Sequence, residues 1–311
     1  MSTPPKIVIL CGGKMAFPAI QTLVLHGYLA GIATGGEDTE ATIWLQTESL
    51  KSSLPFKSFP TKDSLYGLSD WLQELSAEVV LCICFPLKLT QAMLETKKLS
   101  FINFHTGPLP QYRGAMPLFE VLKNQERETV LTLHFMDADF DTGPVILKEP
   151  ISIGEDETFG SLSYKMAERT GQSALNMAQM IEFGSTIPSH PQEETDAQYY
   201  PKPQGRDLLI RWELMQAAEI VALVQACNPW SGGADTFING RNLKILVAKT
   251  GTHNHEVQPG TILALDATNG LQVAGIEQSY VSLEIISSEL GISAGYRLKE
   301  LGVVVGHRFL S

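Results

Sequence analysis

Three polar residues near the middle of the chain, Asn103, His105 and Asp141, carry side chains of the kinds that stabilise a developing oxyanion and move protons. Asn103 and His105 are two residues apart at the end of a strand-like run, so their side chains project from the same face of that strand. Asp141 follows 36 residues after His105, in a turn that closes with Thr142-Gly143. Each residue also has a structural explanation: a loop cap, a hydrogen-bonded histidine at the end of a sheet, and a residue that holds its own turn. Together, the three predict a catalytic site.

The segments around these residues alternate between two hydrophobic patterns. A continuous apolar run at 6–11 ends in Gly12-Gly13, as a strand buried on both faces does, and an amphipathic helix pattern follows it. This alternation implies parallel β-α-β units, and it predicts a wound α/β domain with helices on both faces of the sheet. Ligands of such sheets bind at the carboxyl edge of the strands, which is where Asn103 and His105 lie. The predicted strands are near 29–33, 78–85, 100–104, 129–136 and 145–150, and the later helices near 40–52, 64–75 and 158–183.

The texture of the sequence changes after Gly184. Residues 185–205 are rich in proline, glutamine and acidic residues and have neither periodicity, so they predict a linker. A helix pattern at about 213–226 then precedes short strand-like runs separated by turn signals such as Asn239-Gly240 and Asn269-Gly270. We therefore predict a catalytic α/β domain at 1–184, a linker at 185–205, and a small antiparallel β-barrel domain of OB-like type at 206–311.

Composition narrows the class of protein. The 311 residues are 44% hydrophobic, which is typical of a globular protein, and the net charge of −11 disfavours a broadly basic surface for nucleic acid. The four cysteines lie on or beside apolar runs and indicate buried free thiols in a reducing compartment. No signal peptide pattern and no apolar stretch of the ~18 residues that a membrane span needs is present, so we expect a cytoplasmic protein without a membrane partner.

Two familiar kinds of site are disfavoured. The turn after the first strand-like run lacks the G-x-G-x-x-G spacing, so a dinucleotide-binding dehydrogenase is not expected. Cys82-x-Cys84 and His253-x-His255 have no second pair of ligands at suitable spacing, so no metal site is expected.

A longer pattern carries a resemblance. The segment N-x-H-x-x-P-L-P-x-Y-R-G from Asn103 to Gly114, followed by D-x-D-x-D-T-G from Asp137, resembles the formyltransferases that use 10-formyltetrahydrofolate. The resemblance continues past the linker through Ile210-Arg211-Trp212 and the run N-P-W-S-G-G-A at 228–234. Over the full length it is closest to the members of that superfamily that act on methionyl-tRNA. It implies a Rossmann-like formyltransferase domain followed by the small barrel.

The resemblance also implies a mechanism. A formyl group passes from a folate nitrogen to an acceptor amine through a tetrahedral intermediate, and Asn103 and His105 stabilise its oxyanion. Asp141 orients His105 and helps to pass protons, and either His105 or Asp141 is the general base. The folate pterin is expected between a strand end and two loops, namely Phe85, Pro86 and Leu87, the loop Gly107, Pro108, Leu109 and Pro110, and the turn with Asp137 and Asp139. Arg113 is expected to be structural and to tie the carbonyls of its loop.

Two features bear on the acceptor. The sequence G-P-L-P after the histidine is also reminiscent of formyltransferases that act on amino sugars. The stretch 34–50, which corresponds to a basic loop of the transfer-RNA enzymes, has no Lys or Arg and carries Glu37, Asp38, Glu40 and Glu48, and an acidic loop repels phosphates. Against this, the C-terminal region offers several cations, and barrels of this type bind nucleic acid on a basic groove. These cations are Arg206, Arg211, Arg241, Lys244, Lys249, Arg297, Lys299 and Arg308.

Three functions therefore stay open. The favoured one is formyl transfer from 10-formyltetrahydrofolate to methionyl-tRNA, with the charged initiator transfer RNA held through the C-terminal domain. The alternative is the same chemistry on an amino sugar or another small or carrier-bound amine. A related hydrolase would use water in place of the amine. A non-enzymatic folate-binding module is the third, and the intact Asn103, His105 and Asp141 argue against it. We expect a monomer.

Overall fold

The computed structural model describes residues 4–36, 40–95 and 99–311. The chain forms two compact units. Unit 1 comprises Met1–Pro117, Glu128–Ser152 and Ser163–Tyr200, and unit 2 comprises Leu118–Arg127, Ile153–Leu162 and Pro201–Ser311. The domain boundaries given above stay predictions.

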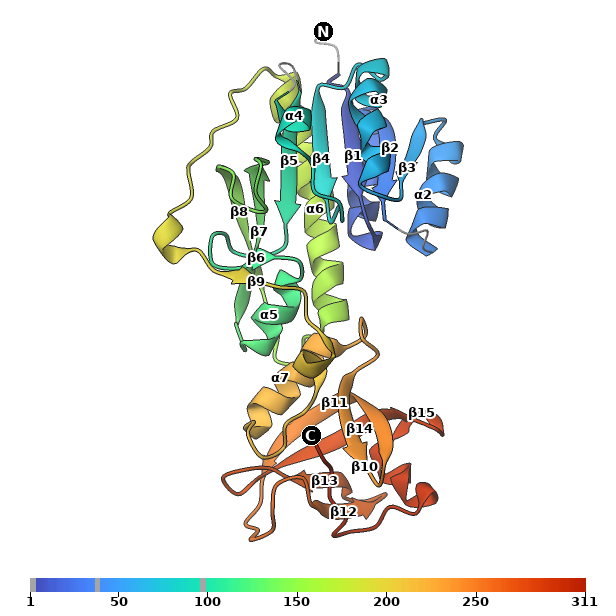
Figure 1. Ribbon diagram of the computed structural model, residues 1–311, viewed down its shortest axis with the longest axis vertical. Coiled ribbons are helices and arrows are strands. Elements are labelled where there is room, and N and C mark those ends of the chain that lie inside the picture. The colour runs from blue at the N-terminus through green and yellow to red at the C-terminus, as the bar shows by residue number, and fades with distance from the viewer. Residues whose placement is uncertain (1–3, 37–39, 96–98) are drawn as a thin grey trace. The chain divides into compact units, whose positions relative to one another are not determined.

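Unit 1 is built on a seven-stranded sheet with the order β3-β2-β1-β4-β5-β7-β8. The first five strands in this order are mutually parallel, as the alternating pattern predicts, whereas β7 is antiparallel to both β5 and β8. The sheet is therefore a wound α/β sheet with an antiparallel edge (Figure 1). The strands are β1 (Ile7–Cys11), β2 (Leu29–Gly35), β3 (Phe56–Phe59), β4 (Val79–Ile83), β5 (Ser100–His105), β7 (Glu128–Phe135) and β8 (Val145–Ser152). The strand β3 was not predicted.

The helices of the chain follow the predicted pattern, although α3 and α7 each begin four residues later than predicted. They are α1 (Phe17–Leu25), α2 (Glu40–Lys51), α3 (Leu68–Glu74), α4 (Gln91–Leu94), α5 (Pro117–Lys123), α6 (Phe159–Glu182) and α7 (Ala217–Cys227).

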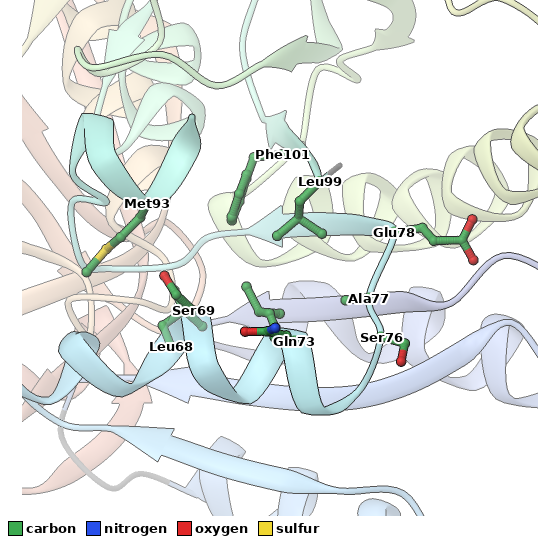
Figure 2. Close-up of a pocket in the computed structure, with 10 residues that line it drawn as sticks. Leu68, Ser69, Gln73, Ser76, Ala77, Glu78, Met93, Leu99 and Phe101 are labelled. Carbon is green, nitrogen blue, oxygen red and sulfur yellow. The ribbon is translucent and has the colours of Figure 1, made fainter. Parts of the chain in front are cut away.

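A cavity of about 660 Å³ lies beside α3 at the amino ends of β4 and β5 (Figure 2). Because Asn103 and His105 lie at the opposite, carboxyl end of β5, this cavity is not part of the predicted site.

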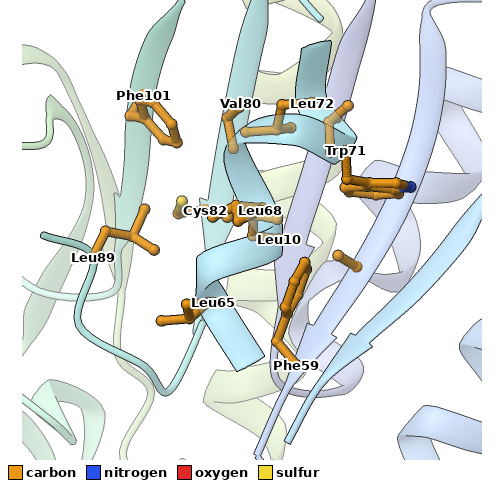
Figure 3. Packing of buried hydrophobic residues seen from close by; sticks show 12 residues of the cluster. Leu10, Phe59, Leu65, Leu68, Trp71, Leu72, Val80, Cys82, Leu89 and Phe101 are labelled. Atoms are coloured by element: carbon orange, nitrogen blue, oxygen red, sulfur yellow. The ribbon is translucent and has the colours of Figure 1, made fainter. Parts of the chain in front are cut away.

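Alternate residues of the central strands form a core under α3. Val8 and Leu10 of β1 and Val80 of β4 pack with Leu68 and Leu72 of α3, and all five side chains are buried (Figure 3). Ile7 and Ile9, which project to the other face of β1, are fully buried as well. Both faces of the sheet are therefore covered, which explains the unbroken apolar run of the first strand.

The four cysteines are free, as predicted. Cys11, Cys82 and Cys227 are buried, whereas Cys84 is exposed, so the prediction of a buried thiol is wrong at that position. The reason is that β4 ends at Ile83 and the chain turns at Cys84, whose φ is 52°. Among the described residues, no helix combines the length and the apolar character that crossing a membrane requires. The cytoplasmic location and the monomeric state stay predictions.

Unit 2 contains an antiparallel sheet with the order β10-β11-β14-β13-β12, and β15 pairs with β14. The C-terminal residues complete it, because Ile262 and Phe309 donate backbone hydrogen bonds to His307 and Gly260, and Phe237 and Leu310 bond to each other in both directions. A chain segment thus links the two end strands, as a small barrel requires. The strands are β10 (Ala234–Ile238), β11 (Arg241–Thr252), β12 (Ile262–Asp266), β13 (Gly270–Ala274), β14 (Ser279–Ser288) and β15 (Gly291–Ala294).

Candidate functional site

The structure brings the three predicted catalytic residues into contact at the carboxyl end of β5. Asp141 Oδ1 lies 3.3 Å from His105 Nδ1 and accepts a 3.4 Å hydrogen bond from Asn103 Nδ2. The His105 side chain is 5% exposed and that of Asp141 is 9% exposed, so the pair is nearly shielded from water. The carboxylate therefore links the imidazole and the amide.

His105 has an acceptor in front of each ring nitrogen. The Tyr112 carbonyl oxygen lies 2.7 Å from Nε2, and the Asp141 carboxylate faces Nδ1. A carbonyl and a carboxylate can only accept, so the ring satisfies both contacts when both nitrogens carry a proton. This arrangement suits an imidazolium paired with a carboxylate.

Asp141 is held from several sides. Its backbone lies in the left-handed region with φ 61°, a conformation that residues other than glycine rarely adopt. Its Oδ2 atom accepts a 3.0 Å hydrogen bond from the Gly114 backbone N–H. Burial by itself would raise the pKa of Asp141, but the charge of His105 and the hydrogen bonds from His105 and Gly114 hold that pKa well below its ordinary value. The carboxyl group is therefore ionised throughout the neutral range.

His134 belongs to the same group, and it was missed. It lies directly opposite Asn103 in the antiparallel pair of β5 and β7, and it is 2% exposed. Its Nδ1 lies 2.8 Å from the Phe135 carbonyl oxygen and therefore donates, which leaves Nε2 to accept from Asn103 Nδ2 at 3.0 Å. The only signal in the sequence is a histidine within an apolar strand, and its position depends on the register of β5 against β7.

The turn after β7 carries Asp141 and closes through side chains of its own. Thr142 Oγ1 donates to Asp137 Oδ1 at 2.5 Å and contacts the Asp139 carbonyl oxygen at 3.3 Å. A Cβ atom at Gly143 would overlap the carbonyl oxygen of Phe135, so only glycine lets the turn approach the end of β7 this closely. Asp137 is thus occupied within the turn.

The loop after β5 is anchored from below by β7 and β8. Thr132 donates to the Gly107 carbonyl oxygen at 2.7 Å, and Lys148 donates to the Leu109 carbonyl oxygen at 2.6 Å. The Leu109 side chain is fully buried and Pro110 is buried too, whereas Pro108 is half-buried. The carbonyl oxygens of Pro108 and Pro110 accept from the backbone N–H groups of Tyr112 and Gln198, so all four carbonyl oxygens of the loop are engaged within the chain.

The predicted strand-end segment lies beside the turn. Lys88 pairs with Asp139 at 3.3 Å, and its ammonium lies 5.4 Å from the centre of the Phe140 ring. Of the residues predicted to touch folate here, Phe85 and Leu87 pack on the core cluster under α3, and Pro86 is exposed. The segment after β4 and the turn after β7 therefore face each other at the carboxyl edge of the sheet.

Arg113 ties loops together, as predicted, although its partners are side chains and not carbonyls. The buried guanidinium donates to Gln192 Oε1 at 2.9 Å and to both carboxylate oxygens of Glu194, at 2.7 and 3.0 Å. Gln192 and Glu194 come from the predicted linker, so part of that segment belongs to the surroundings of the site. Nothing in its composition indicated this.

Most cations of the C-terminal region have anionic partners. Lys244 pairs with Asp235 at 2.8 Å, and Arg308 pairs with Glu213. Arg206, Arg241, Lys249 and Arg297 form further ion pairs with Asp207, Glu289, Glu284 and Glu300. Within the part of the chain that the structure describes, Arg211 and Lys299 have no ion pair within 4.0 Å.

The acidic stretch 34–50 spans the end of β2 and most of α2. Glu40 pairs with Lys14 at 2.9 Å, and both side chains are exposed. Glu37 and Asp38 lie outside the described residues. Residues 4–36, 40–95 and 99–311 contain no group of three or more His, Cys, Asp or Glu that could hold a metal ion.

Comparison with known proteins gives one consistent family. The family described as "Formyl transferase" matches residues 51–177, and the family described as "Formyl transferase, C-terminal domain" matches residues 204–291. The methionyl-tRNA formyltransferase of Syntrophus aciditrophicus is 30% identical over 294 residues, which cover 91% of this chain and 92% of that protein. The methionyl-tRNA formyltransferase of Orientia tsutsugamushi is 28% identical, with 92% of each chain covered.

Solved structures share the fold at lower identity. WlaRD, a sugar 3N-formyl transferase crystallised in the presence of dTDP and 5-N-formyl-THF, superposes with a TM-score of 0.66 at 17% identity, covering 90% of this chain and 97% of that one. The N-formyltransferase from Helicobacter canadensis, in complex with folinic acid and dTDP-3-aminofucose, gives a TM-score of 0.66 at 16% identity, covering 89% of this chain and 98% of that one. At this identity the similarity bears on the fold alone.

Proposed function

The chain belongs to the 10-formyltetrahydrofolate-dependent formyltransferases and is an enzyme of that class, and from this premise we propose that its acceptor is the α-amino group of methionyl-tRNA. The observation that carries the proposal is the extent of the match, since relatives named for that acceptor align with over 90% of the chain. The match to a formyltransferase C-terminal domain at 204–291 supports it further.

In the proposed mechanism, the neutral acceptor amine attacks the formyl carbon of the donor. A C–N bond forms, and the carbonyl oxygen becomes an oxyanion. An amide N–H of Asn103 donates to that oxygen, and its long 3.4 Å bond to Asp141 is the one it gives up to do so. The imidazolium of His105, which Asp141 holds in place, adds positive charge to the site.

Collapse of the intermediate breaks the bond between the formyl carbon and the folate nitrogen. We assign the proton transfers to the His105–Asp141 pair. The pair supplies a proton to the leaving nitrogen through water and regains one from the ammonium group formed by the attack, so it ends in its starting state. An α-amino group with a pKa of about 8 is partly neutral at pH 7, so no strong base is needed.

The proposed folate site lies between the segment Phe85–Leu87 and the turn that contains Asp137, Asp139 and Asp141. One observation supports it: Lys88 bridges the two segments through its ion pair with Asp139. Pro86 and Phe140 are both exposed there and offer the apolar contact that ligand pockets commonly provide.

The acceptor is tested by comparing two substrates. The enzyme is incubated with 10-formyltetrahydrofolate and either methionyl-tRNA or dTDP-3-aminofucose, and tetrahydrofolate release is followed together with the mass of the product. We expect kcat/KM to be at least 100-fold higher for methionyl-tRNA, equivalent to about 2.7 kcal/mol of transition-state stabilisation. Efficient formylation of the sugar alone would overturn the assignment of the acceptor and leave the chemistry intact.

A second candidate acceptor is an amino sugar or another small amine. Two observations favour it: residues 34–50 contain no Lys or Arg, and six of the eight C-terminal cations named above are engaged in ion pairs. The salt dependence of the binding constant K for the acceptor distinguishes the two, since each phosphate that the protein neutralises lowers log K by about 0.9 per tenfold rise in salt concentration. A steep slope supports transfer RNA, and a flat one supports the small amine.

A further inference from the structure

Residues 190–200, called the strap here, cross the site within unit 1. His190 and Val145 exchange two backbone hydrogen bonds of 2.8 Å at one end of the strap. At the other end, β9 (Tyr199–Tyr200) pairs with β6 (Arg113–Gly114). Between them, Gln198 donates its backbone N–H to the Pro110 carbonyl oxygen at 3.1 Å. The strap therefore joins the loop after β5 to the start of β8, which follows the turn that carries Asp141.

Gln192 is the residue of the strap that contacts the turn itself. Its Nε2 atom donates to the carbonyl oxygens of Asp141 and Gly143, each at 2.8 Å. Its Oε1 atom accepts from Arg113 Nε and Nη2, at 3.3 and 2.9 Å. A guanidinium has no acceptor, so Arg113 determines which end of the amide faces it, and the amide nitrogen must point at the two carbonyls.

These contacts act where the backbone is strained. Asp141 has a φ of 61°, and an aspartate in this region persists when its surroundings hold it there. A change in that backbone angle would swing the carboxylate away from His105 Nδ1 and from the Gly114 N–H. Gln192 binds the carbonyl of Asp141 and that of the residue two positions later, so it brackets the strained peptide units.

We propose that Gln192, oriented by Arg113, is a positioning residue for formyl transfer, which sets the backbone of Asp141 and thereby the His105–Asp141 contact. This inference rests on the proposed role of Asp141. It assigns a function to a segment that the sequence indicated to be a linker.

Two variants remove the contact in different ways. Gln192→Glu keeps the shape and an acceptor for Arg113 but has no N–H for the two carbonyls. Gln192→Met keeps the length of the side chain without charge or hydrogen bonds. Gln198→Glu is the matched control, because it makes the same change on the same strap at an exposed side chain whose hydrogen bonds in the described residues come from its backbone.

The readouts are kcat, KM for the donor, and the 15N chemical shift of His105 Nδ1, which reports the contact of that nitrogen with Asp141. We expect both Gln192 variants to lose about 10- to 100-fold in kcat with little change in KM, as when catalytic groups are displaced by a fraction of an ångström. The charged or titratable groups that face Asp141 are His105, His134 and Arg113. A looser contact with Asp141 changes the chemical shift of His105 Nδ1 in the folded protein, and this change does not depend on how much protein is folded.

The reference variant Asp141→Asn separates the possible failures. If Asp141→Asn retains near-parental kcat, the proposed site itself is wrong. If Asp141→Asn loses kcat as expected while both Gln192 variants match Gln198→Glu in kcat and in the chemical shift of His105 Nδ1, only the positioning role is refuted. Loss of folded protein in both Gln192 variants would also refute it, because the contact would then stabilise the fold.

Discussion

Replacement of Asp141 by asparagine tests the centre of the proposed site. In the folded chain, Oδ1 faces His105 Nδ1 at 3.3 Å and Asn103 Nδ2 at 3.4 Å, and Oδ2 accepts from the Gly114 N–H at 3.0 Å. Asparagine offers one oxygen in place of two, so its NH2 group must face either the imidazole or the Gly114 N–H. The variant thus removes the negative charge and one acceptor without changing the size of the side chain.

The magnitude follows from the geometry. Two unit charges 3.3 Å apart attract by about 5 kcal/mol at an effective dielectric constant of about 20, which is an upper limit for what the imidazolium loses. The remaining amide oxygen keeps one hydrogen bond, so we expect a net loss of about 3–4 kcal/mol in transition-state stabilisation, or about 10²- to 10³-fold in kcat. Because Asp141 is nearly buried, added salt should screen its pair with His105 only weakly, so the loss in kcat should change little with salt concentration.

The assay follows tetrahydrofolate release at saturating donor and acceptor, and donor affinity is measured separately by calorimetry. Donor affinity is expected to stay within about threefold of the parent, because the loss belongs to the transition state. Asp156→Asn, at an exposed carboxylate, is the matched control and should retain full activity. Near-parental kcat in Asp141→Asn would refute the electrostatic reasoning given above.

Three further predictions concern stability. Since the pKa of Asp141 is lowered in the folded state, its ionised form stabilises the fold fully above the unfolded pKa of about 3.9, and this stabilisation is lost as pH falls below it. Urea titrations should therefore show a constant gap between parent and Asp141→Asn from pH 7 to about 5, and a shrinking gap below pH 4; a gap that widens on acidification would contradict the sign. Gly143→Ala forces a Cβ onto a backbone carbonyl of β7 and should destabilise the protein by about 2–4 kcal/mol, whereas Gly13→Ala, with open space around it, should be near neutral in the same titration. Trp212→Phe removes the 2.9 Å bond from Nε1 to Thr236 Oγ1 in unit 2 and should lower the melting temperature by the equivalent of about 1–2 kcal/mol; an unchanged melting temperature would show that this buried bond contributes nothing.

Periodicity predicted most elements because it reflects burial directly. The run at 6–11 became β1, covered on both faces, and the long amphipathic pattern at 158–183 became α6. The short strand β3 was missed because its four residues, three of them only half-buried, carry no distinct pattern. The antiparallel direction of β7 was not predicted either, since a strand pattern does not contain the direction of its partner.

The sequence likewise indicated some residues of the site and not others. Asn103 and His105 were found because two residues of one strand must share a face, and Asp141 was found through its place in a recognisable pattern. His134 was missed because only the register of β7 places it opposite Asn103. Gln192 was missed because its contacts with Asp141 and Gly143 join residues about 50 positions apart.

By itself, therefore, the sequence determined the class of fold and the three polar residues, because alternation, spacing and apolar runs are local properties of the chain. The tertiary structure alone decided which neighbours surround those residues. Hydrogen bonds between distant segments depend on register and on how loops cross, and neither is encoded in any one stretch of sequence. The ionised Asp141 lies beside an imidazole of His105 that has a partner at each ring nitrogen, and the strap holds the turn that carries Asp141. These contacts exist only once the sheet has brought the segments together.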